Sequence, residues 1–363
     1  MSASVTNSIQ RKGALPPPSP EVLCSALGIS SLTIDWLAGD GSDRSYYRIS
    51  SPELAKPTVL MQLSGVDAEA LQRGGYDWVT IAGMLAARGI VVPRVLSALP
   101  DHAALVIEDY GDRMLEGQVF GLFTQGRIRD ALPLYDDCFS IIGRFLAIPQ
   151  DPAAVWCQRR FDADRYIWEL NFFLAKYAGP VAGIKLTPGE REAFDRDVKR
   201  LSEFLARAAK YFVHRDFHSR NLMYSDGKLA VLDFQDARIG PASYDLVSLC
   251  FDSYVPFDKT TRSELMERGT KIISEVLGHS KIKLESDVAN EINAQWRPML
   301  LQRQLKAIGS FGFLTVDKNK GDYLKYAVPA ATMLEAHGVA DERWPFLSDT
   351  LVGMLRKTMD RKF

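Results

Sequence analysis

The fold of this chain is decided by two short segments near its middle. Residues 213–221 read VHRDFHSRN, and residues 231–236 read VLDFQD. Between them, Ser225-Asp226-Gly227-Lys228 has the turn chemistry of a β-hairpin. Residues 229–232 (LAVL) form a compact apolar run that is typical of a buried strand. We therefore expect Asp233 to emerge at a strand end, in a hairpin that brings both segments to one place.

The polar residues of these segments meet the needs of phosphoryl transfer from a nucleotide. Such a reaction needs Mg²⁺, an acceptor hydroxyl held in line with the leaving oxygen, and positive charge near the phosphates. Asp216 can accept the proton of the hydroxyl, and Asn221, on the same loop, can bind the metal through its carbonyl oxygen. Asp233 is the other metal ligand, because Mg²⁺ prefers carboxylate oxygens. His214, at the end of an apolar strand, is assigned a supporting role.

Each of these motifs is common by chance when it stands alone. A His-Arg-Asp triplet carries no conclusion by itself, and an Asp-Phe dipeptide carries less. Their order, the spacing from Asp216 to Asn221 and the hairpin between them together favour a kinase over coincidence.

Upstream, the chain has the alternating pattern of a small β-rich lobe. Residues 32–37 alternate as a half-buried strand does, and residues 46–50 and 58–63 are two further strand candidates. The turn between the first two, residues 39–45 (GDGSDRS), can bring backbone N–H groups close to phosphate oxygens, although many such turns are ordinary ones. We predict that the nucleotide phosphates are bound by residues in and next to this turn: Ser42, Asp43, Arg44, Ser45 and Arg48.

The third strand candidate lacks a lysine that could bind the phosphates, since residues 59–63 read VLMQL. An arginine can supply the charge, because its planar guanidinium suits phosphate, and we favour Arg44 over Arg48. The alternative is that Arg44 is a surface arginine. Residues 76–87 are predicted to be the single helix of this lobe. Residues 103–107 form a strand that leads into a hinge, where the main chain of Glu108 and Tyr110 is placed to bind adenine.

After the hinge the pattern becomes helical. Thr187-Pro188-Gly189-Glu190 has the features of a helix start with a capping box, and the apolar residues that follow mark one buried face. Residues 168–173 lie on an earlier helix, where Glu169 can accept hydrogen bonds from sugar hydroxyls or remain an exposed acid. Arg303 and Lys306 lie three residues apart on a late helix and face the same side. They either close the acceptor site or decorate the surface.

Composition agrees with a soluble enzyme. The 363 residues, 47% of them hydrophobic and 25% charged, are enough for two lobes with separate cores. The net charge of −1 gives no general attraction to nucleic acid or to anionic lipid. The four cysteines lack metal-type spacing and read as reduced residues. No signal peptide or membrane-spanning run is evident, so we expect a cytoplasmic protein without a membrane partner.

The central segments resemble the aminoglycoside phosphotransferase and choline kinase group more than protein kinases. His218 stands where protein kinases carry a lysine, and Gln235 replaces the glycine of their Asp-Phe-Gly motif. The resemblance implies a small-molecule acceptor and places His218 among the catalytic residues. It makes Asp236 a second metal ligand, a substrate contact or a solvated carboxylate. It also implies that Asp245, in the helix 241–249, supports the loop backbone through hydrogen bonds.

A narrower resemblance covers residues 30 to 335. The segments 39–48, 212–221, 233–249 and 302–309 resemble the bacterial N-acetylmuramate/N-acetylglucosamine anomeric kinases of cell-wall recycling. That family implies a cytoplasmic enzyme that phosphorylates the C1 hydroxyl of an amino sugar with ATP and Mg²⁺. Our candidate substrate residues are Glu169, Asp236 and Arg303. One departure is Gln304, where a histidine is expected, and it leaves the acceptor open.

The sequence therefore predicts an α+β, two-lobe fold like that of protein kinases. We expect a disordered leader over residues 1–20, an N-lobe over 21–110 and a C-lobe over 111–363. Other acceptors, such as another sugar, an aminoglycoside or a choline-like alcohol, remain alternatives. A nucleotide-binding pseudokinase scaffold is an alternative of another class. A protein kinase is disfavoured, because no Ala-Pro-Glu segment follows Asp233.

Overall fold

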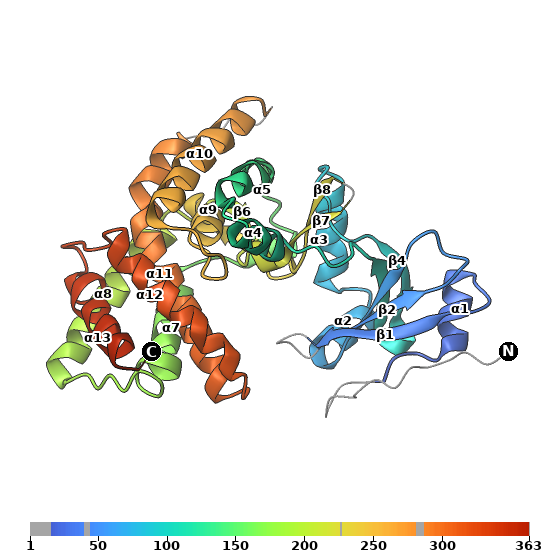
Figure 1. Ribbon diagram of the computed structural model, residues 1–363, viewed down its shortest axis with the longest axis horizontal. Helices are drawn as coiled ribbons and strands as arrows, with labels where there is room; N and C mark the ends of the chain where they lie inside the picture. Colours follow the sequence, from blue (N-terminus) through green and yellow to red (C-terminus); the bar gives the residue numbers. More distant parts are fainter. Residues whose placement is uncertain (1–15, 40–43, 226, 281–286, 363) are drawn as a thin grey trace. The chain divides into compact units, whose positions relative to one another are not determined.

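The computed structural model describes residues 16–39, 44–225, 227–280 and 287–362. The chain forms two compact units. The first comprises Met1–Arg113 and Met223–Gln235, and the second comprises Met114–Leu222 and Asp236–Phe363. Figure 1 shows strands in the N-terminal, blue part of the chain and mostly helices in the part coloured green to red. The first boundary thus falls at Arg113, close to the predicted hinge.

The first unit is built on a five-stranded antiparallel sheet of order β1-β2-β3-β5-β4. Its strands are β1 (Thr33–Gly39), β2 (Ser45–Ser50), β3 (Thr58–Gln62), β4 (Val95–Leu99) and β5 (Ala104–Glu108). Tyr47 and Ile49 of β2 share a buried cluster with Leu60 and Val106, and Leu23 of α1 (Pro20–Leu27) packs against it. The four strands expected from the sequence are confirmed, and β4 was not anticipated.

The helices of this unit correct one prediction. Besides α3 (Asp77–Ala86), which matches the expected helix, the unit contains α1 and α2 (Gly65–Gln72). The prediction of a single helix was wrong because α2 buries only Ala68 and Leu71, while Val66 is exposed. So weak an apolar stripe cannot be told from a loop by pattern alone. The expected leader lies mostly outside the described residues, and α1 already begins at Pro20.

The predicted hairpin is present as β7 (Leu222–Ser225) and β8 (Lys228–Val231). Its turn contains Gly227 at φ 73°, a left-handed conformation that glycine adopts without strain. Residues 223–235 belong to the first unit, although the predicted C-lobe included them. Backbone hydrogen bonds explain this: Val231 N–H donates to Val91 O, and Tyr224 N–H donates to Arg113 O.

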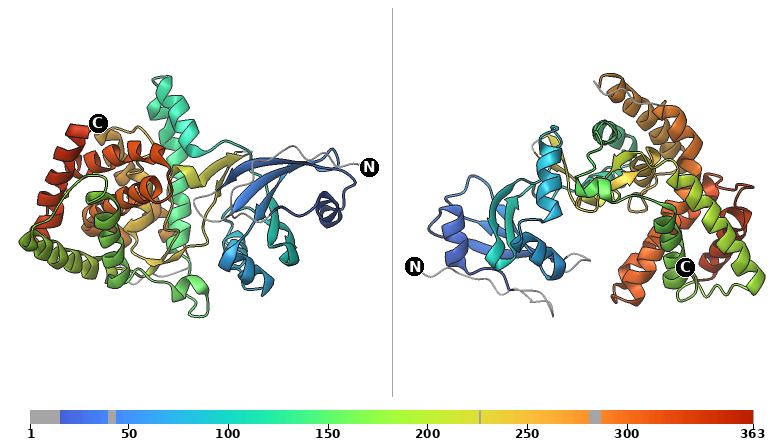
Figure 2. Two further views of the ribbon diagram at one scale, coloured as in Figure 1. Left: turned by 90° about the horizontal axis from the view of Figure 1, so that it is seen from below. Right: turned by 180° about the vertical axis from the view of Figure 1, so that it is seen from behind.

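The second unit is mainly helical. Its α-helices are α4 (Leu115–Thr124), α5 (Leu132–Leu146), α6 (Val155–Gln158), α7 (Ala163–Phe173), α8 (Pro188–Ala206), α9 (Ser243–Cys250), α10 (Lys259–Gly278), α11 (Val288–Val316), α12 (Ala327–Ala336) and α13 (Val352–Lys362). Two short strands, β6 (Tyr211–Val213) and β9 (Arg238–Gly240), pair antiparallel. The long helix α11 contacts α7, α9 and α12, and Figures 1 and 2 show it among them.

The predicted features of α8 are confirmed. Thr187 caps the helix through a capping box with Glu190, as its sequence indicates. The apolar stripe of α8 is buried, with Phe194, Val198 and Leu201 at most 1% exposed. This stripe is core rather than a binding face.

Candidate active site

The loop 214–221 follows β6 and is anchored by a buried carboxylate. Asp245 of α9 accepts hydrogen bonds from the backbone N–H groups of His214 (2.6 Å) and Arg215 (3.0 Å). Arg215 has φ 83°, a conformation that a non-glycine residue keeps only when its surroundings enforce it. Burial raises the pKa of Asp245 to about 6, against the effect of His214 and of both hydrogen bonds. Asp245 therefore holds a strained turn directly before Asp216.

His214 lies inside the core beside this turn. Its side chain is buried, and its ring lies near Phe145 and Phe217, at centroid distances of 6.2 and 5.6 Å. This position suits packing support, as the sequence suggested, rather than contact with a ligand.

Asp216 is ion-paired with a lysine from the distant helix α11. Lys306 Nζ lies 2.9 Å from Asp216 Oδ1, and Arg215 Nε lies 3.9 Å from Oδ2. Burial raises the pKa of the Asp216 carboxyl, but Lys306, Arg215 and Arg303 together hold it well below its usual range. Asp216 is therefore a carboxylate at neutral pH.

Asn221 is oriented by the same loop. Its Nδ2 donates to the backbone oxygen of Asp216 (2.9 Å), which leaves Oδ1 as the side-chain atom able to coordinate a cation. The loop is fastened by Asp252, whose Oδ2 accepts hydrogen bonds from Ser219 N (2.9 Å) and Ser219 Oγ (2.5 Å). Asp252 Oδ1 accepts another from Tyr254 N (2.8 Å). The loop is therefore rigidly tied to the segment after α9.

Arg220 ties the loop to two further elements. Its Nη2 donates to Glu116 Oε1 of α4 (2.7 Å) and to the Tyr326 hydroxyl (2.6 Å). Its guanidinium also lies over the ring of Tyr254, 4.0 Å from the centroid. Sequence reasoning did not single out Arg220, because nothing in the motif indicates which partners the fold supplies.

A cavity of about 230 Å³ opens beside Asp216 within the second unit. Asp216 lines it together with His218, Arg303, Gln304 and Lys306. The remaining lining residues come from α9, from the segment after it and from α11: Ser248, Phe251, Asp252, Ser253, Tyr254, Ala307, Ser310 and Phe311. A hollow with a carboxylate and several hydrogen-bonding groups suits a small polar acceptor.

His218 lines this cavity with an uncharged ring. Burial lowers its pKa to about 4, although Asp252 and Asp216 act in the opposite direction. Its ring packs edge-on against Tyr254, at a centroid distance of 5.3 Å. Its Nδ1 is buried and has no hydrogen-bond partner within the described part of the chain. His218 can therefore exchange a hydrogen bond with an acceptor without bringing charge to it.

Two further residues of α11 complete the cavity wall. Arg303 is 7% exposed, so the alternative of a surface role is wrong. Gln304 is buried as well; its Nε2 donates to Phe251 O (2.7 Å) and its Oε1 accepts from Ser253 Oγ (3.3 Å). The glutamine that departs from the expected histidine thus lies in the wall of the cavity beside Asp216.

Two predicted substrate residues, Glu169 and Asp236, lie outside the lining of the cavity beside Asp216. Glu169 is not exposed, as one alternative had it, but is 1% accessible and bonded to Arg165 Nε (3.1 Å) and Gln302 Nε2 (2.8 Å). Asp236 is paired with Arg215 Nη1 (2.7 Å). Neither lines the cavity beside Asp216. Both carboxylates therefore support neighbouring arginines in this structure, and a direct substrate contact for either remains a prediction.

In the first unit, Arg44 is held by carboxylates. Its Nε donates to Asp67 Oδ2 of α2 (2.9 Å), and its Nη1 lies 3.8 Å from Asp233 Oδ1. The Tyr76 hydroxyl donates to the same Asp67 oxygen (3.4 Å). The Arg44 side chain is 10% exposed, so the alternative of a surface arginine is wrong. Burial lowers the pKa of Arg44, but Tyr76 and the surrounding groups raise it overall, so the guanidinium stays charged.

Asp233 follows β8 as predicted. Its φ is 60°, and its Oδ1 accepts a hydrogen bond from Gln235 Nε2 (2.6 Å). Like the Oδ1 of Asn221, its carboxylate is a hard oxygen ligand of the kind that Mg²⁺ takes. The side chains at these two positions thus fit the expected metal in chemical type. No cluster of three His, Cys, Asp or Glu residues with metal-site geometry occurs among the described residues.

The other residues predicted to bind the nucleotide phosphates have different surroundings from those of Arg44. Ser42 and Asp43 lie outside the described residues. Ser45 is 3% exposed at the start of β2. Arg48 is directed to carboxylates, with Nε 2.5 Å from Asp109 Oδ2 and Nη2 2.9 Å from Asp112 Oδ1. Its neighbours in the sheet explain this, because β2 and β5 flank β3 and the long side chain reaches the segment after β5. A phosphate contact for Arg48 stays a prediction, because these ion pairs neither show it nor contradict it.

The predicted hinge residues also have partners. The N–H of Glu108 donates to Arg94 O (3.0 Å), so a contact of Glu108 with adenine would have to use its carbonyl. The Glu108 side chain binds Arg94 (2.8 Å to Nε) and accepts from the Tyr110 hydroxyl (3.2 Å). Burial, followed by the charge of Glu108, raises the pKa of Tyr110 to about 12.

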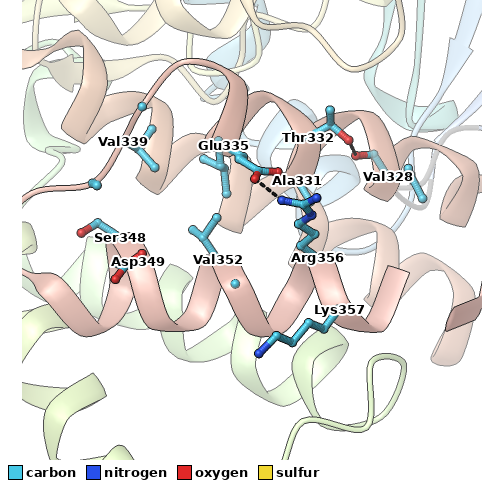
Figure 3. A pocket seen from close by; sticks show the side chains of 14 residues that line it. Val328, Ala331, Thr332, Glu335, Val339, Ser348, Asp349, Val352, Arg356 and Lys357 are labelled. Atoms are coloured by element: carbon cyan, nitrogen blue, oxygen red, sulfur yellow. Dashed lines mark hydrogen bonds and ion pairs between the residues drawn. The ribbon is translucent and has the colours of Figure 1, made fainter. Parts of the chain in front are cut away.

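Other hollows lie away from these residues. The one in Figure 3, about 850 Å³, lies between α12 and α13 and contains the ion pair of Glu335 with Arg356. None of the predicted site residues lines it. In the described part of the chain, no helix is both long and apolar enough to cross a membrane.

Comparison with known proteins agrees with this geometry. Residues 34–275 match the model of the phosphotransferase enzyme family. The chain belongs to this family, and the predicted family and enzyme class, a phosphotransferase acting on small molecules, are confirmed.

Several proteins of similar sequence carry the same name. The chain is 28% identical over 306 residues to the N-acetylmuramate/N-acetylglucosamine kinase of Pseudomonas aeruginosa, covering 79% of this chain and 78% of that protein. It is 30% identical over 266 residues to the enzyme of the same name from Caulobacter vibrioides, covering 63% and 69%. A third match, 32% identical to the Neisseria meningitidis kinase of that name over 177 residues, covers 49% of this chain and about half, 51%, of that protein.

Solved structures share the fold. An ADP-bound aminoglycoside phosphotransferase superposes with a TM-score of 0.57 at 15% identity, over 92% of this chain and 97% of the other. Choline kinase from Cryptosporidium parvum superposes with a TM-score of 0.59 at 10% identity, over 88% and 93%. The predicted two-lobe, α+β fold is confirmed.

Proposed function

We propose that this phosphotransferase moves the γ-phosphoryl group of ATP to the C1 hydroxyl of N-acetylmuramate or N-acetylglucosamine. The observation that carries the proposal is the ionised Asp216 at the wall of a small polar cavity. The names of its relatives support the amino-sugar acceptor. We also propose that it works in the cytoplasm, where ATP is available, and without a nucleic-acid or membrane partner.

In the proposed reaction, Asp216 orients the acceptor hydroxyl and receives its proton. The hydroxyl oxygen forms a bond to the γ-phosphorus, the bond to the bridging oxygen breaks, and ADP leaves with that electron pair. A carboxylate whose pKa is strongly lowered is a weak base, so the proton moves late, which agrees with a loose transition state. The main contribution of Asp216 is then the position of the hydroxyl.

Two residues are proposed to hold Mg²⁺, Asn221 through Oδ1 and Asp233 through its carboxylate. When bound, the ion would offset the negative charge of the phosphate oxygens. Asn221 is already oriented by its hydrogen bond to the backbone of Asp216 (2.9 Å).

Arg44 is proposed to take the place of the missing strand lysine. Gln62, on the strand that lacks it, is 2% exposed, and its Nε2 donates to His102 O (2.8 Å) and Ala103 O (3.2 Å). Gln62 is thus committed to the backbone. Arg44, oriented by Asp67, is a charged group of the first unit with the fork geometry that phosphate needs.

An aminoglycoside acceptor is less well supported. Such a substrate is a polycation and needs an acidic pocket. The cavity beside Asp216 contains two cations, Arg303 and Lys306, as well as two carboxylates, Asp216 and Asp252. Its charges therefore do not favour a polycation.

The test is ATP consumption with Mg²⁺ across N-acetylmuramate, N-acetylglucosamine, other hexoses and aminoglycosides. We expect an acid-labile C1 phosphate on an amino sugar, identified by phosphorus NMR. The Asp216→Asn variant should keep its fold and bind nucleotide, while kcat falls by roughly 10²- to 10⁴-fold. Turnover on another acceptor only would reject the amino sugar. Nucleotide binding without turnover on any acceptor would favour a pseudokinase scaffold.

A further inference from the structure

Arg303 is a buried cation that forms no ion pair with a carboxylate among the residues that the structure describes. It is 7% exposed and lines the cavity beside Asp216. Its Nη1 donates to the Tyr244 hydroxyl (3.0 Å), and its guanidinium lies over the Tyr244 ring, 4.8 Å from the centroid. Its Nε is buried and has no hydrogen-bond partner among the residues that the structure describes.

The carboxylates whose charge acts on Arg303 are already paired with other cations. Asp216 and Glu169 both act on the charge of Arg303. However, Asp216 is ion-paired with Lys306 at 2.9 Å, and Glu169 with Arg165 at 3.1 Å. Asp252, which also lines the cavity, receives three hydrogen bonds from Ser219 and Tyr254. Within the described residues, Arg303 itself forms no ion pair with any of them.

Burying a guanidinium without an opposite charge beside it lowers the free energy of unfolding. Proteins normally pair buried charges, because removing a charge from water without an opposite charge or full hydrogen bonding is strongly unfavourable. Arginine has five N–H donors in a fixed fork, and a carboxylate can satisfy two of them at once. An anionic group in the cavity would therefore gain from a site that is already desolvated and oriented.

We propose that the acceptor cavity selects an acceptor that carries a carboxylate, and that Arg303 binds this carboxylate. This inference rests on the proposed amino-sugar kinase function and deepens it. N-acetylmuramate carries a carboxylate on its lactyl group, whereas N-acetylglucosamine lacks one, so the acidic sugar is the preferred substrate. Lys306 is engaged by Asp216, and His218 is neutral, so Arg303 is the cation of the cavity wall that remains for the acceptor.

The direct experiment uses the unmodified enzyme and three acceptors. The kcat/KM is measured for N-acetylmuramate, for its neutral methyl ester and for N-acetylglucosamine. We expect the acid to exceed the ester by roughly 10- to 100-fold, the loss that accompanies removal of a charge-assisted hydrogen-bond pair. Equal values for the acid and the ester would overturn the inference and leave the proposed function intact. If the enzyme neither binds nor phosphorylates either amino sugar, both the inference and the proposed function are rejected.

A substitution locates the effect. In Arg303→Met, which keeps much of the apolar bulk, the kcat/KM for N-acetylmuramate should fall to the value for its ester, so that the preference for the acid disappears. Arg297→Met is the matched control, because Arg297 is an exposed arginine of the same helix and does not line the cavity. An equal loss on all three acceptors would mean that Arg303 serves Asp216 or the phosphates instead, which would overturn the inference.

Discussion

At the scale of single residues, the charge on Asp216 depends on Lys306. The two lie 90 positions apart in the sequence, and their side chains meet at 2.9 Å. Burial lowers the pKa of Lys306, which stays below its usual value although Asp216 acts to raise it. Burial raises the pKa of Asp216, but the charges of Lys306, Arg215 and Arg303 outweigh this effect and hold that pKa well below its usual range. The pair therefore keeps an ionised carboxylate in a place where burial alone would protonate it.

Removal of Lys306 should shift the pH dependence of the reaction. In Lys306→Gln the pKa of Asp216 rises, and the carboxylate is protonated at a higher pH than in the unmodified enzyme. The acidic limb of the kcat/KM profile should therefore move to higher pH. Lys318→Gln, an exposed change just beyond the same helix, should leave the profile in place. An unmoved limb in Lys306→Gln would show that Lys306 does not set this pKa.

The position of Arg44 gives a second prediction at this scale. Asp67→Asn keeps the shape of its side chain but removes the negative charge that orients Arg44. If Arg44 binds the phosphates, the KM for ATP should rise roughly tenfold, because a charge-assisted contact loses its preset geometry. Glu69→Gln is the matched control, since Glu69 lies on the same helix and its side chain is 65% exposed. An unchanged KM for ATP in Asp67→Asn would remove the pair from nucleotide binding.

At the scale of elements, α11 is the support of the acceptor cavity. It supplies Arg303, Gln304 and Lys306 to the cavity wall, and its two glycines, Gly309 and Gly312, allow close approach to α7 and to the π-helical turn after it. A Cβ added at Gly309 would lie 2.7 Å from the Cα of Phe173. The cavity residues are therefore positioned by backbone contacts one to two turns further along the helix.

Substitution of Gly312 tests this support. In Gly312→Ala the new Cβ would lie 2.3 Å from the backbone oxygen of Lys176, so the helices must separate. We expect a loss of about 1 to 3 kcal/mol in the free energy of unfolding, measured by urea denaturation. Gly83→Ala on α3 is the control, because nothing lies within 4 Å of its added Cβ, and it should gain up to about 1 kcal/mol. A stable Gly312→Ala would mean that the contact is not tight.

At the scale of the whole molecule, the chain order and the folded units do not coincide. The first unit takes in residues 223–235 after the chain has already entered the second. Asn221 and Asp233 are therefore close in sequence but belong to different units: Asn221 is in the second unit and Asp233 is in the first. The net charge of −1 gives little general attraction to an anionic substrate, so the proposed function depends on local groups such as Arg44 and Arg303.

Local sequence rules predicted much of this protein correctly. The hairpin turn at Gly227, the capping box at Thr187 and the alternating strand β2 each follow from interactions within a few residues. The family followed from the resemblance of the central motifs to known phosphotransferases. By contrast, α2 was missed because its apolar face is weak, and the ion pairs of Arg48 were not anticipated because its partners, Asp109 and Asp112, lie more than 60 positions away, after β5.

The sequence by itself determined the class of reaction, since the order of Asp216, Asn221 and Asp233 is a property of the chain. Only the tertiary structure decided the partners of these residues. Lys306 reaches Asp216 from a distant helix, and Arg303 is buried beside the cavity, where its Nε has no hydrogen-bond partner in the described part of the chain. The physical reason is that the charge and pKa of a buried group depend on which other charges the fold brings within a few ångströms, and local spacing does not encode those contacts.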